Sequence, residues 1–392
     1  MNNPSRRKFL KTCGALAATG TMPLFFCKKS GVSKEPLRNV ICIIGDDHSA
    51  NVVGCYDNDI IRTPNLDRLA QQGVKFTNAF AQAPLCSASR QSILTGKYPH
   101  ATGVTLLRTS FPDEHVTIAE HLKKFGYRTA LIGKSHFNNN LPHGFDVRIG
   151  AGDYRAHLEK NPPKKVPEDI KTRPKWRPFR DHARIWLNSQ MLPEDKYDQD
   201  TETTFLTEKA IDFLRENVDN PFCLWIGYHE PHSPFNFPVE YRGKYKPENM
   251  PLPEGSPEDD RWIPMVFKDL TDDEKRGIIA SYYTSVEYLD NKVGHILDEL
   301  DKLGLDKNTL VIYIGDQGYL LGDHKRFEKH TMWDPAIRAP LIMRMGNREQ
   351  ETKTVDALTE FVDLAPAILD VLDIPPMTDV QGRSFLPVID GE

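Results

Sequence analysis

The stretch Val-Ile-Cys-Ile-Ile-Gly-Asp-Asp, residues 40–47, decides the fold. Five consecutive apolar residues followed by a glycine are typical of a parallel strand that is buried on both faces. The strand ends in two adjacent carboxylates, Asp46 and Asp47. Because ligands of α/β sheets bind outside the carboxyl ends of the strands, we expect these two side chains at a ligand site.

Three further apolar runs have the same character, at residues 129–132, 222–226 and 310–314. Segments with helical spacing of apolar residues alternate with them, which predicts an α/β fold with a large, mostly parallel central sheet flanked by helices. Polar side chains follow each run: Lys134 and His136, then His229 and His232, then Asp316 and Gln317. We therefore expect these groups to converge with Asp46 and Asp47 at one edge of the sheet.

Residues 86–90, Cys-Ser-Ala-Ser-Arg, place a thiol and a guanidinium four positions apart at the start of a predicted helix. The backbone N–H groups and the dipole of a helix N-terminus both favour an anion. The pattern indicates a nucleophile, Cys86, beside an anion clamp that includes Arg90. A Ser-rich helix start with a small buried cysteine and a surface arginine is the plain alternative.

The 392 residues carry a formal net charge of −5 and are 39% hydrophobic. This composition allows one large core, or a main domain with a small appendage. The negative charge excludes a general attraction to nucleic acid, so recognition of anions has to be local to a pocket. The six cysteines include no Cys-x-x-Cys pair, so neither a zinc site nor a disulfide framework is predicted.

Residues 1–30 are predicted to be an export signal of the twin-arginine (Tat) type. Arg6 and Arg7 form the twin-arginine pattern, and the apolar run at residues 13–27 is too short to span a bilayer. We therefore expect export by the Tat machinery to the periplasm or the cell exterior. An anchored or disordered N-terminus is the alternative, and a lipid anchor at Cys27 is left open.

Residues 160–190 form a basic, proline-rich insertion. Its lysines and arginines are interleaved with prolines and with aromatic residues that include Trp176, Phe179 and Trp186. A solvated surface loop is one interpretation. The functional interpretation is a substrate-facing insertion whose cations and flat aromatic faces suit an anionic sugar chain.

Hard oxygen donors and cations are predicted around the same strand ends. The residues that provide oxygen donors are Asp46, Asp47, Asp316 and Gln317. Oxygen donors select Ca²⁺ or Mg²⁺ over zinc, and because Ca²⁺ accepts a variable number of oxygen ligands, this set favours Ca²⁺. A divalent metal beside several cations suits a multiply oxygenated anion such as sulfate or phosphate; the cations are Arg90, Lys134 and Lys329. His136 and His232 would supply acid and base near neutral pH.

From about residue 40 to residue 391 the chain resembles the sulfatase family, within the alkaline phosphatase-like superfamily. The motifs that carry the resemblance occur in the family's order: residues 86–90 with 94–99, 133–136, 231–234, 316–318, 321–324, and Lys329 ahead of residues 337–341. The resemblance implies an alkaline phosphatase-like sandwich, with a catalytic domain over residues 38–392.

The resemblance also implies that a maturase oxidises Cys86 to formylglycine, whose hydrated aldehyde supplies the nucleophilic oxygen. The modified Cys86 would hold Ca²⁺ together with Asp46, Asp47, Asp316 and Gln317. Sulfate binding and proton transfer would fall to Arg90, Lys134, His136, His232 and Lys329. By the same resemblance, His136 would be the base on the hydrate and His232 the proton donor to the leaving group.

Three features depart from the family pattern. Ala88 stands where proline is usual, so modification needs a maturase that accepts alanine, and Gln317 stands where asparagine or histidine is commoner. Residues 382–386 resemble the segment before the family's C-terminal subdomain, yet the sequence stops at Glu392. The usual small second sheet is therefore expected to be missing or truncated.

The resemblance to the sulfatase family, the export signal and the basic insertion together predict an exported, Ca²⁺-dependent sulfate ester hydrolase that acts on sulfated carbohydrate or glycosaminoglycan-like substrates. A phosphonate or phosphate ester hydrolase with the same nucleophile is the enzymatic alternative. The alternative from another class is a non-catalytic anion-binding or glycan-binding protein, in which Ala88 blocks modification.

Overall fold

The computed structural model describes residues 36–178, 180–348 and 352–391. The predicted export signal at residues 1–30 lies outside the described residues. Within the described part of the chain, no helix combines the length and the apolar character that are needed to cross a lipid bilayer.

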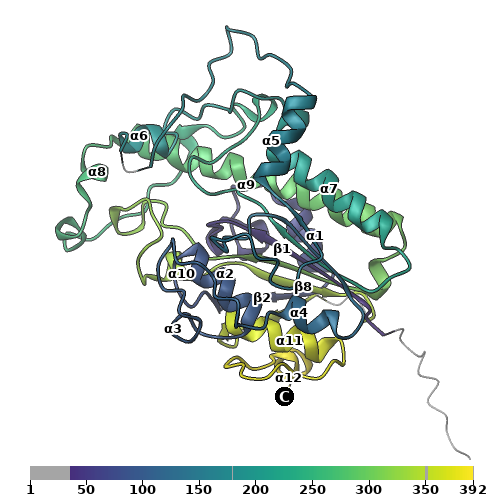
Figure 1. Ribbon diagram of the computed structural model, residues 1–392. Coiled ribbons are helices and arrows are strands. Elements are labelled where there is room, and N and C mark those ends of the chain that lie inside the picture. The colour runs from purple at the N-terminus through teal and green to yellow at the C-terminus, as the bar shows by residue number, and fades with distance from the viewer. Residues whose placement is uncertain (1–35, 179, 349–351, 392) are drawn as a thin grey trace, which may run out of the picture. The chain divides into compact units, whose positions relative to one another are not determined.

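An eight-stranded sheet forms the centre of the fold (Figure 1). Its strands are β1 (Asn39–Gly45), β2 (Val74–Phe76), β4 (Arg128–Gly133), β5 (Val147–Ile149), β6 (Phe222–Gly227), β7 (Thr309–Gly315), β8 (Leu341–Met345) and β9 (Lys353–Val355). They lie in the order β5-β4-β6-β1-β7-β8-β2-β9, and β8 is antiparallel to both of its neighbours while the other pairs are parallel. The predicted mostly parallel sheet is therefore confirmed.

The four strands predicted from sequence are neighbours in space, in the order β4-β6-β1-β7. They run parallel to one another, so their carboxyl ends share one edge of the sheet. This arrangement brings together the polar residues that follow each strand.

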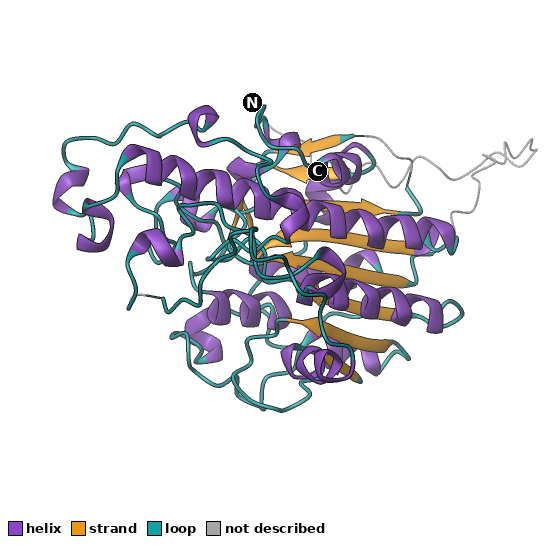
Figure 2. Ribbon diagram, turned by 90° about the horizontal axis from the view of Figure 1, so that it is seen from above, coloured by secondary structure: helices purple, strands orange, loops and turns teal. Residues whose placement is uncertain are grey.

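Helices cover both faces of the sheet (Figures 1 and 2). One face carries α1 (Pro64–Gln71), α7 (Glu202–Glu216) and α9 (Asp272–Lys302), and the other carries α2 (Cys86–Thr95), α4 (Ile118–Lys123), α11 (Leu364–Val371) and α12 (Leu386–Asp390). In β1, Val40, Cys42 and Ile44 pack in the core of the second face, whereas Ile41 and Ile43 pack in the core of the first. Because both faces are covered, the strand is apolar at every position.

Shorter elements complete the fold. They are α3 (Pro99–Thr102), α5 (Ala151–Lys160), α6 (Ala183–Trp186), α8 (Met265–Lys268), α10 (Asp334–Ile337), and the parallel pair β3 (Ala79–Phe80) and β10 (Thr359–Glu360).

The helix α2 is held in place at its C-terminal end. It stops at Gly96, which has a left-handed φ of 65°. The carbonyl of Gly96 accepts a hydrogen bond from the N–H of Gln381 at 2.7 Å. The C-terminal segment of the described chain therefore fixes the end of the helix that begins with Cys86.

The insertion at residues 160–190 contains the short helix α6 and otherwise turns and loops, apart from residue 179, which is not described. Trp186 and Leu187 anchor it in a third apolar core. There the ring of Trp186 contacts Phe267 of α8, with 6.2 Å between the ring centroids.

Candidate active site

The predicted site residues come together where the carboxyl ends of β1, β4, β6 and β7 meet the N-terminus of α2. Cys86 is the first residue of α2, and all ten residues of that helix are buried. Its Sγ accepts hydrogen bonds from Nε2 of Gln317 and from Nζ of Lys329, both at 3.1 Å. The segments that follow β7 therefore reach the predicted nucleophile directly.

A buried cluster of Asp46, Asp47, Asp316 and Cys86 forms the centre of the site. One candidate ligand atom from each of the four lies within 4.8 Å of the others. Two buried acceptor atoms, Oδ1 of Asp46 and Oε1 of Gln317, have no hydrogen-bond partner among the described residues. Oxygens without hydrogen bonds beside clustered carboxylates are the donors that a hard cation such as Ca²⁺ or Mg²⁺ prefers, so these residues fit a divalent metal.

The buried carboxylates differ in their electrostatics. Burial opposes the ionisation of Asp46, but Lys134, whose Nζ bonds to Oδ2 of Asp46, and other nearby cations hold the pKa of this carboxyl well below its usual range. Burial and repulsion from Asp46 raise the pKa of Asp316 to about 7. A divalent cation would relieve this repulsion between carboxylates.

Arg90 and Lys329 pair with the remaining carboxylate oxygens. Nε of Arg90 donates to Oδ2 of Asp316 at 2.7 Å, while its buried Nη2 has no hydrogen-bond partner among the described residues. Nζ of Lys329 donates to Oδ1 and Oδ2 of Asp47 at 2.6 and 2.7 Å. These guanidinium and ammonium groups are the donors that bind oxyanions such as sulfate.

The thiol of Cys86 is not suited to act as the nucleophile itself. Burial, together with repulsion from Asp46, raises its pKa to about 12. At pH 7 the side chain is therefore the neutral thiol, which is a poor nucleophile. The two donors at 3.1 Å from Sγ would suit an oxygen at this position.

Two of the predicted histidines line the pocket. Burial and the nearby charge of Lys134 lower the pKa of His136 to about 3, so its imidazole is neutral at pH 7 and able to accept a proton. Nδ1 of His232 lies 2.7 Å from the carbonyl of Ser233, and Nε2 lies 3.7 Å from Oδ2 of Asp47. His229 follows the same strand as His232 but does not line this pocket.

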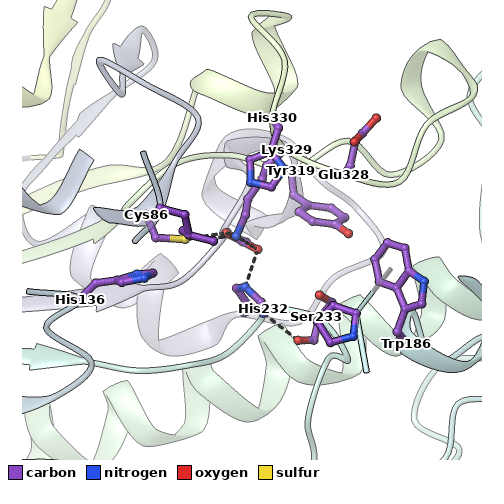
Figure 3. A pocket seen from close by; sticks show the side chains of 12 residues that line it. Cys86, His136, Trp186, His232, Ser233, Tyr319, Glu328, Lys329 and His330 are labelled. Atoms are coloured by element: carbon purple, nitrogen blue, oxygen red, sulfur yellow. Dashed lines mark hydrogen bonds and ion pairs between the residues drawn. The ribbon is translucent and has the colours of Figure 1, made fainter. Parts of the chain in front are cut away.

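An open pocket of about 610 Å³ leads to the cluster (Figure 3). Lining residues that were not predicted as site residues are Leu107, Pro178, Trp186, Ser233, Tyr319, Glu328 and His330. Glu328 and His330 are the sequence neighbours of Lys329, so they could have been predicted as site residues. Leu107 lies in a loop where no sequence motif indicates a site.

The chain belongs to the sulfatase family, because the family model described as Sulfatase matches residues 38–374. It is 27% identical to the N-acetylglucosamine-6-O-sulfatase of Bacteroides thetaiotaomicron, with 92% of this chain and 72% of that protein covered. It is 30% identical to the ulvan-active sulfatase of Formosa agariphila, with 91% and 66% covered. It is 31% identical to the iduronate 2-sulfatase of Mus musculus, with 81% and 61% covered. The chain thus spans about two thirds of the length of these relatives.

Solved structures confirm the alkaline phosphatase-like fold. A phosphonate monoester hydrolase from Silicibacter pomeroyi matches with a TM-score of 0.77 at 26% identity, over 90% of this chain and 77% of that chain. A structure in complex with its substrate D-glucosamine-2-N,6-O-disulfate matches with a TM-score of 0.72 at 25% identity, over 91% of this chain and 81% of that chain.

Proposed function

We propose that this protein hydrolyses sulfate esters of carbohydrates, with Ca²⁺ as its metal and with Cys86 converted to formylglycine. The observation that carries the proposal is the buried cluster of Asp46, Asp47, Asp316 and Cys86, with unpaired oxygens, next to three cations. Three carboxylates and three cations in one buried site are costly unless they serve a metal and an oxyanion.

Asp46, Asp47, Asp316 and Gln317 would hold the Ca²⁺ together with the modified residue 86. The bound Ca²⁺ would supply positive charge to the sulfate oxygens, and formylglycine would supply a hydroxyl nucleophile where the thiol is inert. Arg90, Lys134 and Lys329 would hold sulfate and stabilise the charge that develops on its oxygens.

The two histidines would divide the proton transfers. His136 is neutral at pH 7 and is the group placed to accept a proton near position 86. In His232, Nδ1 donates to the Ser233 carbonyl, so the ring would have to take up a second proton, on Nε2, before it delivers that proton to the leaving oxygen.

The carbohydrate substrate is supported by the relatives, which are named for N-acetylglucosamine, ulvan and iduronate sulfates. Export through the Tat machinery and maturation by an enzyme that accepts Ala88 are part of the same proposal. The twin arginines at residues 6 and 7 and the cysteine at position 86 support them.

Phosphonate ester hydrolysis is the second candidate, because a phosphonate monoester hydrolase shares the fold at 26% identity. The two functions are distinguished by comparing kcat/KM for 4-nitrophenyl sulfate and 4-nitrophenyl phenylphosphonate. The protein is co-produced with a maturase, and peptide mass spectrometry measures how much of Cys86 is converted. We expect the sulfate ester to be preferred. Preference for the phosphonate by fully converted protein would overturn the proposal.

A further inference from the structure

The pocket has two chemically different halves (Figure 3). Cys86, His136, His232 and Lys329 form the polar half, where the sulfate ester would react. Six further lining residues, which we call the outer half, are Leu107, Pro178, Trp186, Tyr319, Glu328 and His330. In the proposed reaction the outer half would face the alcohol part of the ester.

Two buried aromatic side chains make the wall of the outer half rigid. Trp186 is 2% exposed and packs against Phe267. Tyr319 is 3% exposed, donates its hydroxyl to the carbonyl of Phe327 at 3.0 Å and stacks on Tyr282. A fixed apolar wall of this kind favours an uncharged ligand group over a charged one.

Among the described residues of the outer half there is no lysine or arginine that could bind a second anion. Lys329 is the one lysine or arginine among the described residues that line the pocket, and it is bonded to Asp47 and Cys86. The carboxylate of Glu328 accepts a hydrogen bond from Nε of Arg326 at 2.5 Å, which occupies that guanidinium. Partial burial and the charge of Lys329 lower the pKa of His330, which favours its neutral imidazole.

The basic insertion adds no lysine or arginine to the described residues that line the pocket. Among its described residues, only Pro178 and Trp186 line the pocket. Two of its arginines bond elsewhere, Arg173 to Asn236 and Arg184 to Glu274. The insertion therefore contributes apolar surface rather than the positive charge that its composition indicates.

We propose that the outer half is a leaving-group subsite for an uncharged sugar ring, so that the protein selects sugars with a single sulfate and rejects a second anionic group on the same ring. The inference rests on the proposed function and narrows its substrate class. A second sulfate or a carboxylate would lose water at the aromatic wall without gaining a partner, which disfavours binding.

The test compares two ligands that differ in one charged group: N-acetylglucosamine 6-sulfate and glucosamine-2-N,6-O-disulfate. Calorimetry with the Cys86→Ala variant in Ca²⁺ measures binding without turnover. We expect the monosulfated sugar to bind at least about tenfold more tightly. Equal or tighter binding of the disulfate, or no binding of either sugar, would overturn the inference. Turnover of 4-nitrophenyl sulfate by the mature protein tests the proposed function separately.

Two lysine variants test whether the lack of a cation in the outer half is the reason why a second anionic group is rejected. Leu107 lines the pocket at 39% exposure, whereas its neighbour Leu106 is 69% exposed and does not line it. In the Cys86→Ala background, Leu107→Lys is expected to strengthen binding of the disulfate about tenfold with little change for the monosulfate. Leu106→Lys is the matched control and should leave the ratio unchanged. An unchanged ratio in Leu107→Lys would contradict the inference.

Discussion

Cys86 shows how strongly the environment of one residue determines its chemistry. Its position at the start of α2 was evident from sequence, and the thiol next to Arg90 suggested a nucleophile. The surroundings could not be read from sequence, because Asp46, Gln317 and Lys329 arrive from loops 40 to 243 residues away. Burial and the charge of Asp46 keep the thiol protonated and outweigh the opposite effect of Lys329, which is why an oxidised side chain is the better nucleophile.

Replacing Cys86 by alanine removes only the group that the proposal converts to the nucleophile. We expect Cys86→Ala to lower kcat for 4-nitrophenyl sulfate by at least about 10³-fold. The melting temperature should stay within a few degrees, because a single small side chain is lost. Circular dichroism and steady-state kinetics check both parts. Full residual activity would remove the assignment of the nucleophile.

The clustered carboxylates predict a measurable response to metal. Ca²⁺ at about 100 times its Kd is expected to stabilise the folded state by about 2.7 kcal/mol, and a chelator should reverse this gain together with activity. Asp316→Asn should lose most of the gain, whereas Asp59→Asn, an exposed position on the described surface, should retain it. Thermal melts with and without Ca²⁺ measure both. An equal response in the two variants would contradict the proposed metal site.

At the scale of elements, the strands and helices around β1 were predicted well. Their local sequence patterns indicate the same apolar positions that the structure buries. Runs such as residues 310–314 became β7 with one or two residues added at its ends. The strands β8 and β9 were not predicted as part of the sheet. β8 pairs with β7 and with β2, and β9 pairs with β2, which has only three residues and little sequence signal of its own.

The start of α1 depends on a residue of another helix. Its N-cap, Thr63, makes no side-chain capping bond. Instead Asp290 of α9 accepts hydrogen bonds from the N–H groups of Asn65 at 3.2 Å and Leu66 at 2.8 Å. This long-range cap joins two helices on the same face of the sheet.

We therefore expect Asp290→Ala to lower the free energy of unfolding by about 2 kcal/mol, since two buried N–H groups lose their acceptor. Asp298→Ala is the matched control, because Asp298 also reaches α1 from α9 but through an exposed pair with Arg68. The control should cost less than about 1 kcal/mol. Urea unfolding measures both, and similar costs would contradict the capping role.

At the scale of the whole molecule, the edge of the sheet that collects the site residues followed from the α/β pattern alone. The residues that form the wall of the pocket could not be predicted from that pattern. Trp186 was recognised only as part of a basic, aromatic insertion, and two arginines of that segment, Arg173 and Arg184, bond to Asn236 and Glu274 and do not line the pocket. Composition cannot tell which side chains of a long insertion face a cavity, because that depends on tertiary packing.

A buried acid near the site gives the fold a predicted dependence on pH. Glu230 is 3% exposed, and burial raises its pKa to about 8. The folded state therefore keeps a proton that the unfolded chain releases above about pH 4.5, so this group's contribution to stability falls as the pH rises from about 4.5 to 8.

The variant Glu230→Gln removes this titration. Its stability relative to the unchanged protein should increase by up to a few kcal/mol between pH 5 and pH 8. Urea unfolding at several pH values measures the difference. A difference that stays constant across this range would contradict a protonated Glu230 in the folded protein.

The central claim is that the site built around residue 86 hydrolyses sulfate esters of sugars. The most direct measurement is the inorganic sulfate released from N-acetylglucosamine 6-sulfate in Ca²⁺ by protein whose Cys86 is shown to be converted. We predict multiple turnovers of sulfate release and none from the Cys86→Ala variant. No sulfate release from fully converted protein would contradict the account.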